Sequence, residues 1–122
     1  MRLKTRIAPP NSIIFIEDPE HGFPPSITGY ELVTANSSCV AVGTYPEIDG
    51  DTSIVLSNEG KSEQKAAILA FKDSLETPTH QISITTSHNE KIFMMATNNE
   101  RTPVQVWVND NRFPTLIEIV VG

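Results

Sequence analysis

Two acidic stretches hold the side chains whose types and spacing suit chemistry. In one of them, Glu47, Asp49 and Asp51 occupy alternate positions around a turn that contains Gly50. Carboxylate oxygens at this spacing can coordinate calcium, but an EF-hand loop places its glycine after three ligand positions and ends in a glutamate. This stretch has neither feature, so solvated acids at a turn are expected, with a calcium site as the alternative.

The other stretch places Glu17, Asp18 and Glu20 directly before His21. Carboxylates beside a histidine can bind a metal ion or transfer protons. The other two histidines fall in separate turns, so the sequence offers no second histidine at a recognisable metal-binding spacing. We therefore expect no metal and no other cofactor at this stretch.

The sequence contains no recognisable pattern for nucleophilic catalysis or nucleotide binding. No serine lies in a G-x-S-x-G elbow, and no G-x-G-x-x-G or P-loop motif opens a helix. The single cysteine, Cys39, lies in an apolar run, where a buried and unreactive thiol is expected, and one cysteine excludes an intramolecular disulfide. We predict that the protein is not an enzyme.

The charge of the chain narrows the choice of partner. Fifteen aspartates and glutamates against nine lysines and arginines give a formal net charge of −6. This balance argues against binding to nucleic acids or anionic membranes, and it suits a basic protein. In a β-sandwich the loops gather at the two ends, so the acids either disperse over the surface or converge into a patch that imitates nucleic-acid phosphates.

Runs of alternating apolar and polar residues, rich in β-branched side chains, indicate an all-β fold. Nine prolines and six glycines interrupt the chain, which suits short strands. These features predict an antiparallel β-sandwich of about eight short strands. The strands are expected at residues 12–16, 30–33, 39–42, 52–57, 81–86, 91–96, 102–109 and 115–121.

The last two of these strands are expected to form a hairpin at the centre of the sheet core, with Trp107 in the core or at an interface. In the segment 2–7, cationic residues alternate with Leu3, Thr5 and Ile7, and the segment is expected to be a solvated N-terminal arm. Residues 63–76 are ambiguous, because their composition favours a short helix. Residues 65–71 also suit a buried strand that pairs with residues 53–56, and the neighbouring strands favour this second arrangement.

The length predicts one domain spanning residues 1–122. No run approaches the ~18 apolar residues of a membrane span. The N-terminal residues lack the apolar region of a signal peptide, so a cytoplasmic location is expected. An open sheet edge would allow a homodimer.

Five runs carry a resemblance to a known family: IIFI at 13–16 leading to the prolines at 24–25, GDTSIVL at 50–56, AAILAF at 66–71, PVQVW at 103–107 and LIEIV at 116–120. Their order resembles the competence-nuclease inhibitor family, the ComJ-like proteins of bacteria, over most of the chain. The resemblance implies a β-sandwich that binds and blocks a nuclease, with acidic side chains facing the enzyme. It also implies a strand at residues 65–71.

The predicted function is a non-catalytic, acidic protein-binding module of the inhibitor or immunity type, which blocks a basic partner such as a nuclease. The alternative is a calcium- or carbohydrate-binding sandwich that uses the 47–51 loop, with Tyr45 as a ring on which a sugar stacks. For the first function, the predicted partner-binding residues are Glu17, Asp18, Glu20, Glu47, Asp49 and Asp51.

Overall fold

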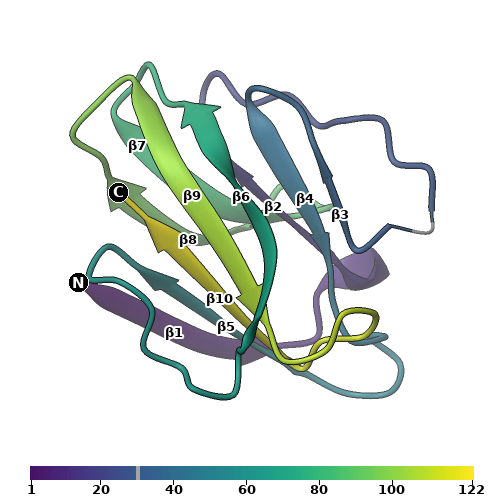
Figure 1. Cartoon of the computed structure of the whole chain (residues 1–122). Helices are drawn as coiled ribbons and strands as arrows, with labels where there is room; N and C mark the ends of the chain where they lie inside the picture. The colour runs from purple at the N-terminus through teal and green to yellow at the C-terminus, as the bar shows by residue number, and fades with distance from the viewer. Residues whose placement is uncertain (30) are drawn as a thin grey trace.

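The computed structural model describes residues 1–29 and 31–122, which form two five-stranded β-sheets packed face to face (Figure 1). In spatial order, the first sheet contains β1 (Arg2–Ile7), β5 (Thr52–Ser57), β10 (Leu116–Val121), β9 (Arg101–Val108) and β6 (Ile68–Glu76). The second sheet contains β3 (Val33–Ala35), β4 (Cys39–Gly43), β2 (Ile13–Glu17), β7 (Gln81–Thr86) and β8 (Lys91–Ala96). The predicted all-β sandwich is confirmed, and its strand pairs are antiparallel except for β5 with β10.

The C-terminal hairpin forms as predicted and lies in the interior of the first sheet. Val104, Val106 and Val108 of β9 alternate inward, opposite Val121, Ile119 and Ile117 of β10. β10 also pairs with β5, and β9 pairs with β6, so neither strand has a free edge. Trp107 lies on the outer side of β9, half-buried, and does not enter the core between the sheets.

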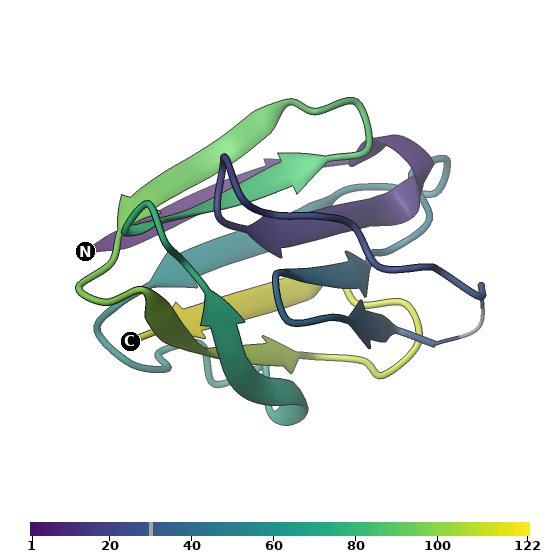
Figure 2. The same ribbon diagram turned by 90° about the horizontal axis from the view of Figure 1, so that it is seen from above.

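The core is built from the inward side chains of both layers. Figure 2 shows the ribbon of the two layers from above, with the two ends of the chain on one side. Most are β-branched or leucine side chains, and burying each contributes ~1.5–3 kcal/mol relative to exposure. The buried members are Ile14, Ile16, Val40, Val42, Ile54, Leu56, Leu75, Ile82, Ile84, Met95, Val104, Val106, Val108, Ile117, Ile119 and Val121.

The ambiguous segment is a strand, so the alternative of a helix at residues 63–76 is wrong. β6 begins only at Ile68, and it pairs with β9. The predicted pairing with residues 53–56 is also wrong, because β1 and β10 occupy both edges of β5. Residues 58–67 instead cross the outer side of the first sheet, where Ala66 is completely buried.

The N-terminal segment is edge strand β1 and not a solvated arm. Leu3 and Ile7 pack against the core, while Arg2, Lys4 and Arg6 point outward. The strand forms because β5 offers a free edge along which the alternating pattern buries its apolar side chains. In the predicted strand 30–33, residue 30 lies outside the described residues, and the strand found there is β3.

Helical structure is limited to one 3-10 turn, Pro10–Ser12, in the described residues. Within residues 1–29 and 31–122, no helix has the length and apolar character needed to cross a bilayer.

Candidate functional site

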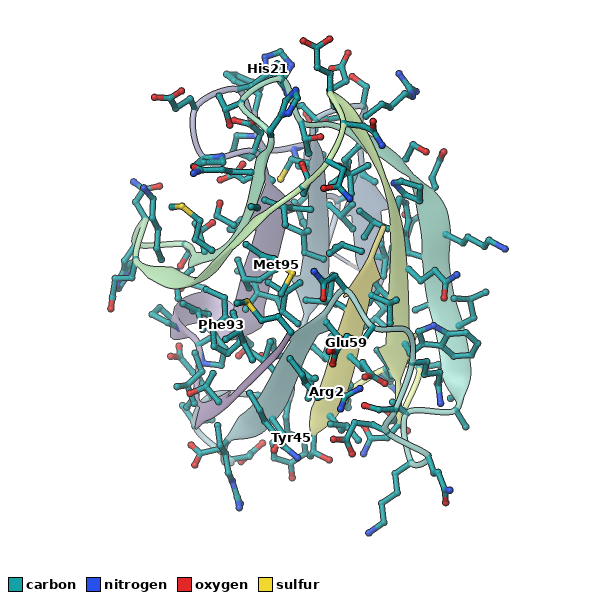
Figure 3. All side chains as sticks on the ribbon, turned by 90° about the vertical axis from the view of Figure 1, so that its left-hand side faces the viewer. Arg2, His21, Tyr45, Glu59, Phe93 and Met95 are labelled. Atoms are coloured by element: carbon teal, nitrogen blue, oxygen red, sulfur yellow. The ribbon has the colours of Figure 1, made fainter. Side chains whose placement is uncertain are left out.

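The two acidic stretches lie at opposite ends of the sandwich. β2 and β4 are antiparallel neighbours, and one stretch follows the end of β2 whereas the other follows the end of β4. Figure 3 shows the separation, with His21 at the top of the molecule and Tyr45 at the bottom. The six predicted residues therefore form two groups of three and not one patch.

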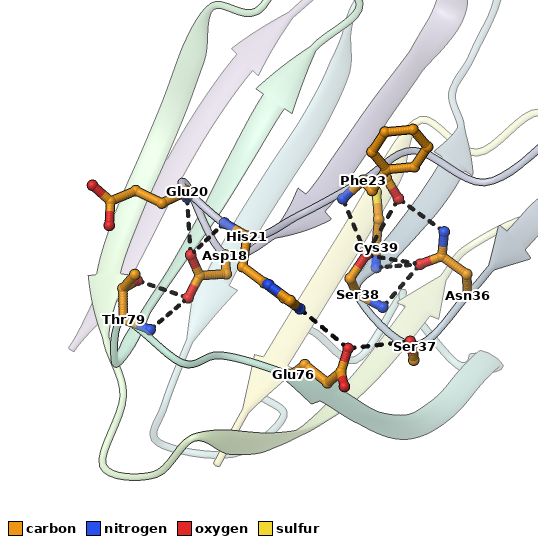
Figure 4. Close-up of polar contacts among 10 residues, drawn as sticks. All are labelled: Asp18, Glu20, His21, Phe23, Asn36, Ser37, Ser38, Cys39, Glu76 and Thr79. Carbon is orange, nitrogen blue, oxygen red and sulfur yellow. Dashed lines mark hydrogen bonds and ion pairs between the residues drawn. The ribbon is translucent and has the colours of Figure 1, made fainter.

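Asp18 fixes the loop that follows β2 (Figure 4). Its side chain is buried, and its carboxylate accepts hydrogen bonds from the backbone N–H groups of Glu20 (2.9 Å) and His21 (3.0 Å) in the same loop. The backbone N–H (2.9 Å) and the hydroxyl (2.7 Å) of Thr79 also donate to it. Burial by itself raises the pKa of Asp18, but the hydrogen bonds outweigh it and lower the pKa below its ordinary value of 3.8. The Asp18 oxygens therefore face donors within the protein.

The same loop joins the two sheets. Nε2 of His21 lies 3.2 Å from Oε1 of Glu76 at the end of β6, and the hydroxyl of Ser37 donates to the same oxygen at 3.2 Å (Figure 4). The hydrogen bonds from His21 and then from Ser37 hold the pKa of Glu76 below its usual range. Both His21 and Glu76 are solvent-accessible, so the contact lies at the surface. It is an ion pair only when His21 is protonated.

Glu17, the last residue of β2, lies beneath this loop beside Cys39. Gly22 packs so closely that a Cβ there would overlap the Glu17 side chain and the carbonyl oxygen of Asp18. Burial raises the pKa of the Cys39 thiol, and the nearby Glu17 carboxylate raises it further. Cys39 is thus a buried, protonated thiol, as predicted.

Five carboxylates gather at this end of the sandwich. Backbone hydrogen bonds from Glu76 to Ser37 (3.0 Å) and from Thr77 to Glu100 (2.8 Å) bring the ends of β6 and β9 next to the loop. The chain segments at this end have a formal charge of −4 with the histidines neutral, because Arg101 is their only lysine or arginine. These segments are residues 17–23, 36–38, 76–81 and 96–101. We call this region the acidic end, defined by Glu17, Asp18, Glu20, Glu76 and Glu100.

Sequence reasoning missed Glu76 and Glu100. The sequence places Glu76 at the end of the alternative helix 63–76 and outside the alternative strand 65–71, and it places Glu100 between the predicted strands 91–96 and 102–109. Only the register that pairs Glu76 with Arg101 places both beside the loop after β2. No local sequence signal carries that register.

The 47–51 stretch lies beside an open groove whose charge is balanced. Its charged lining comprises three carboxylates and three cations, namely Asp49, Asp51, Glu63, Lys4, Arg6 and Lys65. Nε of Arg6 lies 3.6 Å from Oδ2 of Asp51, and Nζ of Lys4 lies 3.4 Å from Oε1 of Glu63. Two of the three acids, Asp51 and Glu63, therefore have a cation of the same chain beside them.

The carboxylates of this stretch do not assemble as calcium ligands. Oε1 of Glu47 accepts the backbone N–H of Asn11 at 3.1 Å, and Asp51 faces Arg6. Across residues 1–29 and 31–122, no three histidine, cysteine, aspartate or glutamate side chains come together as a metal site would require.

The geometry defines the class of protein, a β-sandwich of two five-stranded sheets with acidic side chains gathered at one end. No family model and no curated protein matches the sequence. The structure is similar to that of ComJ from Bacillus subtilis, an inhibitor of the DNA-degrading activity of NucA, with a TM-score of 0.70 and 8% sequence identity. That similarity covers 98% of this chain and 93% of ComJ.

A second similar structure is the product of crocagin biosynthetic gene J. Its TM-score is 0.50 at 10% identity, over 98% of this chain and 94% of that chain. At such identities the likeness establishes the fold. The resemblance to ComJ-like proteins is therefore confirmed at the level of the fold.

Proposed function

We propose that residues 1–122 act as one non-catalytic binding module that inhibits a basic protein partner such as a nuclease. The observation that carries the proposal is the fold shared with ComJ over nearly the whole of both chains, because ComJ inhibits a nuclease. The formal net charge of −6 supports a basic partner, since complementary charge speeds association and suppresses wrong partners.

The acidic end is the surface on which we place the partner. Glu20 and Glu100 are exposed there, on loops held by a rigid β scaffold. A nuclease holds DNA phosphates with cationic side chains, and carboxylates can occupy the same cations. Glu17 lies at this end too. Asp18 supports the surface by fixing the loop that carries Glu20. Residues 47–51 lie at the other end of the sandwich and are not part of the proposed partner-binding surface.

The test begins with the immobilised chain and a lysate of its source organism, loaded at low salt and washed at high salt. A nuclease that is retained, identified and purified is then assayed for DNA degradation with and without the chain. Inhibition that weakens as salt rises supports the proposal, because screening shortens the range of surface charges. A retained nuclease whose activity is unchanged refutes inhibition.

Two matched double variants then locate the surface. Glu20→Gln with Glu100→Gln and Asp49→Asn with Asp51→Asn each remove two exposed carboxylates, one pair from each end. The first pair is expected to weaken binding at low salt by up to about thirtyfold, at ~1 kcal/mol per lost ion pair, and to flatten the salt dependence. The second pair is expected to leave the affinity and its salt dependence unchanged. If instead only the second pair weakens binding, the partner-binding surface lies at the other end.

One observation favours a second candidate, carbohydrate binding. Tyr45, Asn109 and Asp49 line the open groove together, and sugars are bound by aromatic rings beside amides and carboxylates. Titration of neutral oligosaccharides, followed by NMR, tests it. Shifts at Tyr45 and Asn109 that vanish in Tyr45→Ala would support this candidate, and their absence in the native protein would remove it.

A further inference from the structure

Phe23 is the most exposed aromatic side chain among the described residues. Its side chain is 74% exposed, against 45% for Phe113, the next exposed phenylalanine. A buried aromatic ring removes more apolar area from water than most side chains do, and an exposed ring does not make this contribution to folding. A single exposed apolar residue needs no explanation by itself, so its setting decides what it means.

The main chain of Phe23 is held firmly although its ring is exposed. Its N–H donates to Oγ of Ser38 at 3.0 Å, and its carbonyl oxygen accepts from Nδ2 of Asn36 at 2.8 Å (Figure 4). Before it, Gly22 packs against Glu17 with no room for a side chain. After it, Pro24 restricts the Phe23 backbone to extended conformations. The ring is thus presented from a backbone ordered before any partner arrives.

Two carboxylates of the acidic end lie on the segments that position Phe23. Glu20 lies in the same loop, and Glu76 contacts the 36–38 turn to which Phe23 is bonded. An exposed aromatic ring at a charged end of the molecule matches the energetic pattern of protein interfaces, in which a few aromatic residues contribute most of the binding energy. The negative charge of the acidic end fits cationic side chains beside the pocket that receives the ring.

We infer that Phe23 is the apolar centre of the partner-binding surface and inserts into a pocket of the basic partner that is rimmed by lysine or arginine. This inference rests on the proposed function and adds a contact that does not depend on charge. The backbone of Phe23 is already fixed, so little conformational entropy is lost when a partner buries the ring.

The test uses the purified nuclease obtained above and four versions of the full chain: native, Phe23→Ala, Phe23→Leu and Phe113→Ala. Phe113→Ala is the matched control, because it removes an exposed phenylalanine at the other end of the sandwich. Phe23→Ala is expected to raise Kd by about thirtyfold or more at both low and high salt, with the salt dependence unchanged. Phe23→Leu is expected to lose less, and Phe113→Ala to bind as the native chain does.

The possible outcomes separate this inference from the proposed function. Native-like binding by Phe23→Ala overturns the inference alone, while a native chain that binds no nuclease overturns both. Sedimentation supplies a further outcome: a native dimer that Phe23→Ala dissociates would show that a second copy covers the ring, which also overturns the inference. Unfolding midpoints equal to that of the native chain establish that the variants are folded, as expected for exposed positions.

Discussion

Replacing Glu118 by glutamine is expected to lower the free energy of unfolding by about 2 kcal/mol. Glu118 points to the outer side of β10, yet it is completely buried beneath residues 58–67. Its carboxylate accepts from the backbone N–H of Ser62 (3.1 Å to both oxygens), from the Ser62 hydroxyl (2.8 Å) and from the backbone N–H of Glu63 (2.9 Å). One buried carboxylate therefore holds the middle of the crossing segment, at Ser62 and Glu63.

The magnitude follows from counting donors. Glutamine has the same shape but offers one acceptor oxygen, and its NH₂ group faces N–H and O–H donors. At least one of the three donors then loses its partner, and the loss of a hydrogen bond to a charged group costs ~1.5–3 kcal/mol. Removing a buried charge relieves part of its desolvation cost, which keeps the net loss near ~2 kcal/mol. For a chain of this length the melting temperature should fall by roughly 6–10 °C.

Urea unfolding followed by the fluorescence of Trp107 measures this change. Trp107 is paired with Glu118 across β9 and β10, and the Lys61 ammonium of the crossing segment lies 5.0 Å from its ring centroid. The matched control is Glu63→Gln, which removes a partly exposed carboxylate 3.4 Å from Lys4 and should cost less than ~1 kcal/mol. Equal unfolding midpoints for the two variants would refute the assignment of Glu118.

Three further predictions follow from the buried and acidic groups. The lowered pKa of Asp18 contributes stability above pH 3.8 that is lost as the pH falls through the folded-state value, so urea midpoints of the native chain and Asp18→Asn should converge in acid. Cys39, with its pKa raised by burial and then by Glu17, should resist alkylation in the native chain and react in urea; rapid native labelling contradicts this. Added calcium should leave the melting temperature unchanged, because Glu47 and Asp51 face protein groups and the carboxylates of residues 47–51 do not assemble; a concentration-dependent rise would restore the calcium alternative.

The fold was predictable where a periodic pattern coincides with a local connection. The alternation of Val104, Val106 and Val108, followed by a short turn and a second apolar run, specifies both the hairpin and its inward face. The pairing of β6 was not predictable, because the decisive interaction is long-range. Residues 58–67 cross the outer side of the first sheet, where Ser62 and Glu63 donate to Glu118, and this path takes the chain past β5 to pair β6 with β9.

The candidate site was predictable in part for the same reason. The gaps between the predicted strands 12–16 and 30–33 and between 39–42 and 52–57 contain the loops after β2 and β4, but no local pattern shows at which end of a sandwich a loop lies. That follows from the antiparallel pairing of β2 with β4. The burial of Asp18 was equally hidden, since half of its donors come from Thr79, 61 residues away in the sequence.

Asp18 and Glu118 use one structural device, a buried carboxylate whose acceptors satisfy the N–H groups of a loop. Neutralising such a residue therefore changes the loop as well as the charge. Asp18→Asn should loosen the backbone at Glu20 and His21, which Asp18 holds, and so weaken partner binding at low and high salt alike. Glu20→Gln removes charge from a loop that stays in place, so its effect should fade as salt rises. If Asp18→Asn instead behaves like Glu20→Gln, Asp18 acts on the partner through its charge and the loop-holding role assigned to it here is wrong.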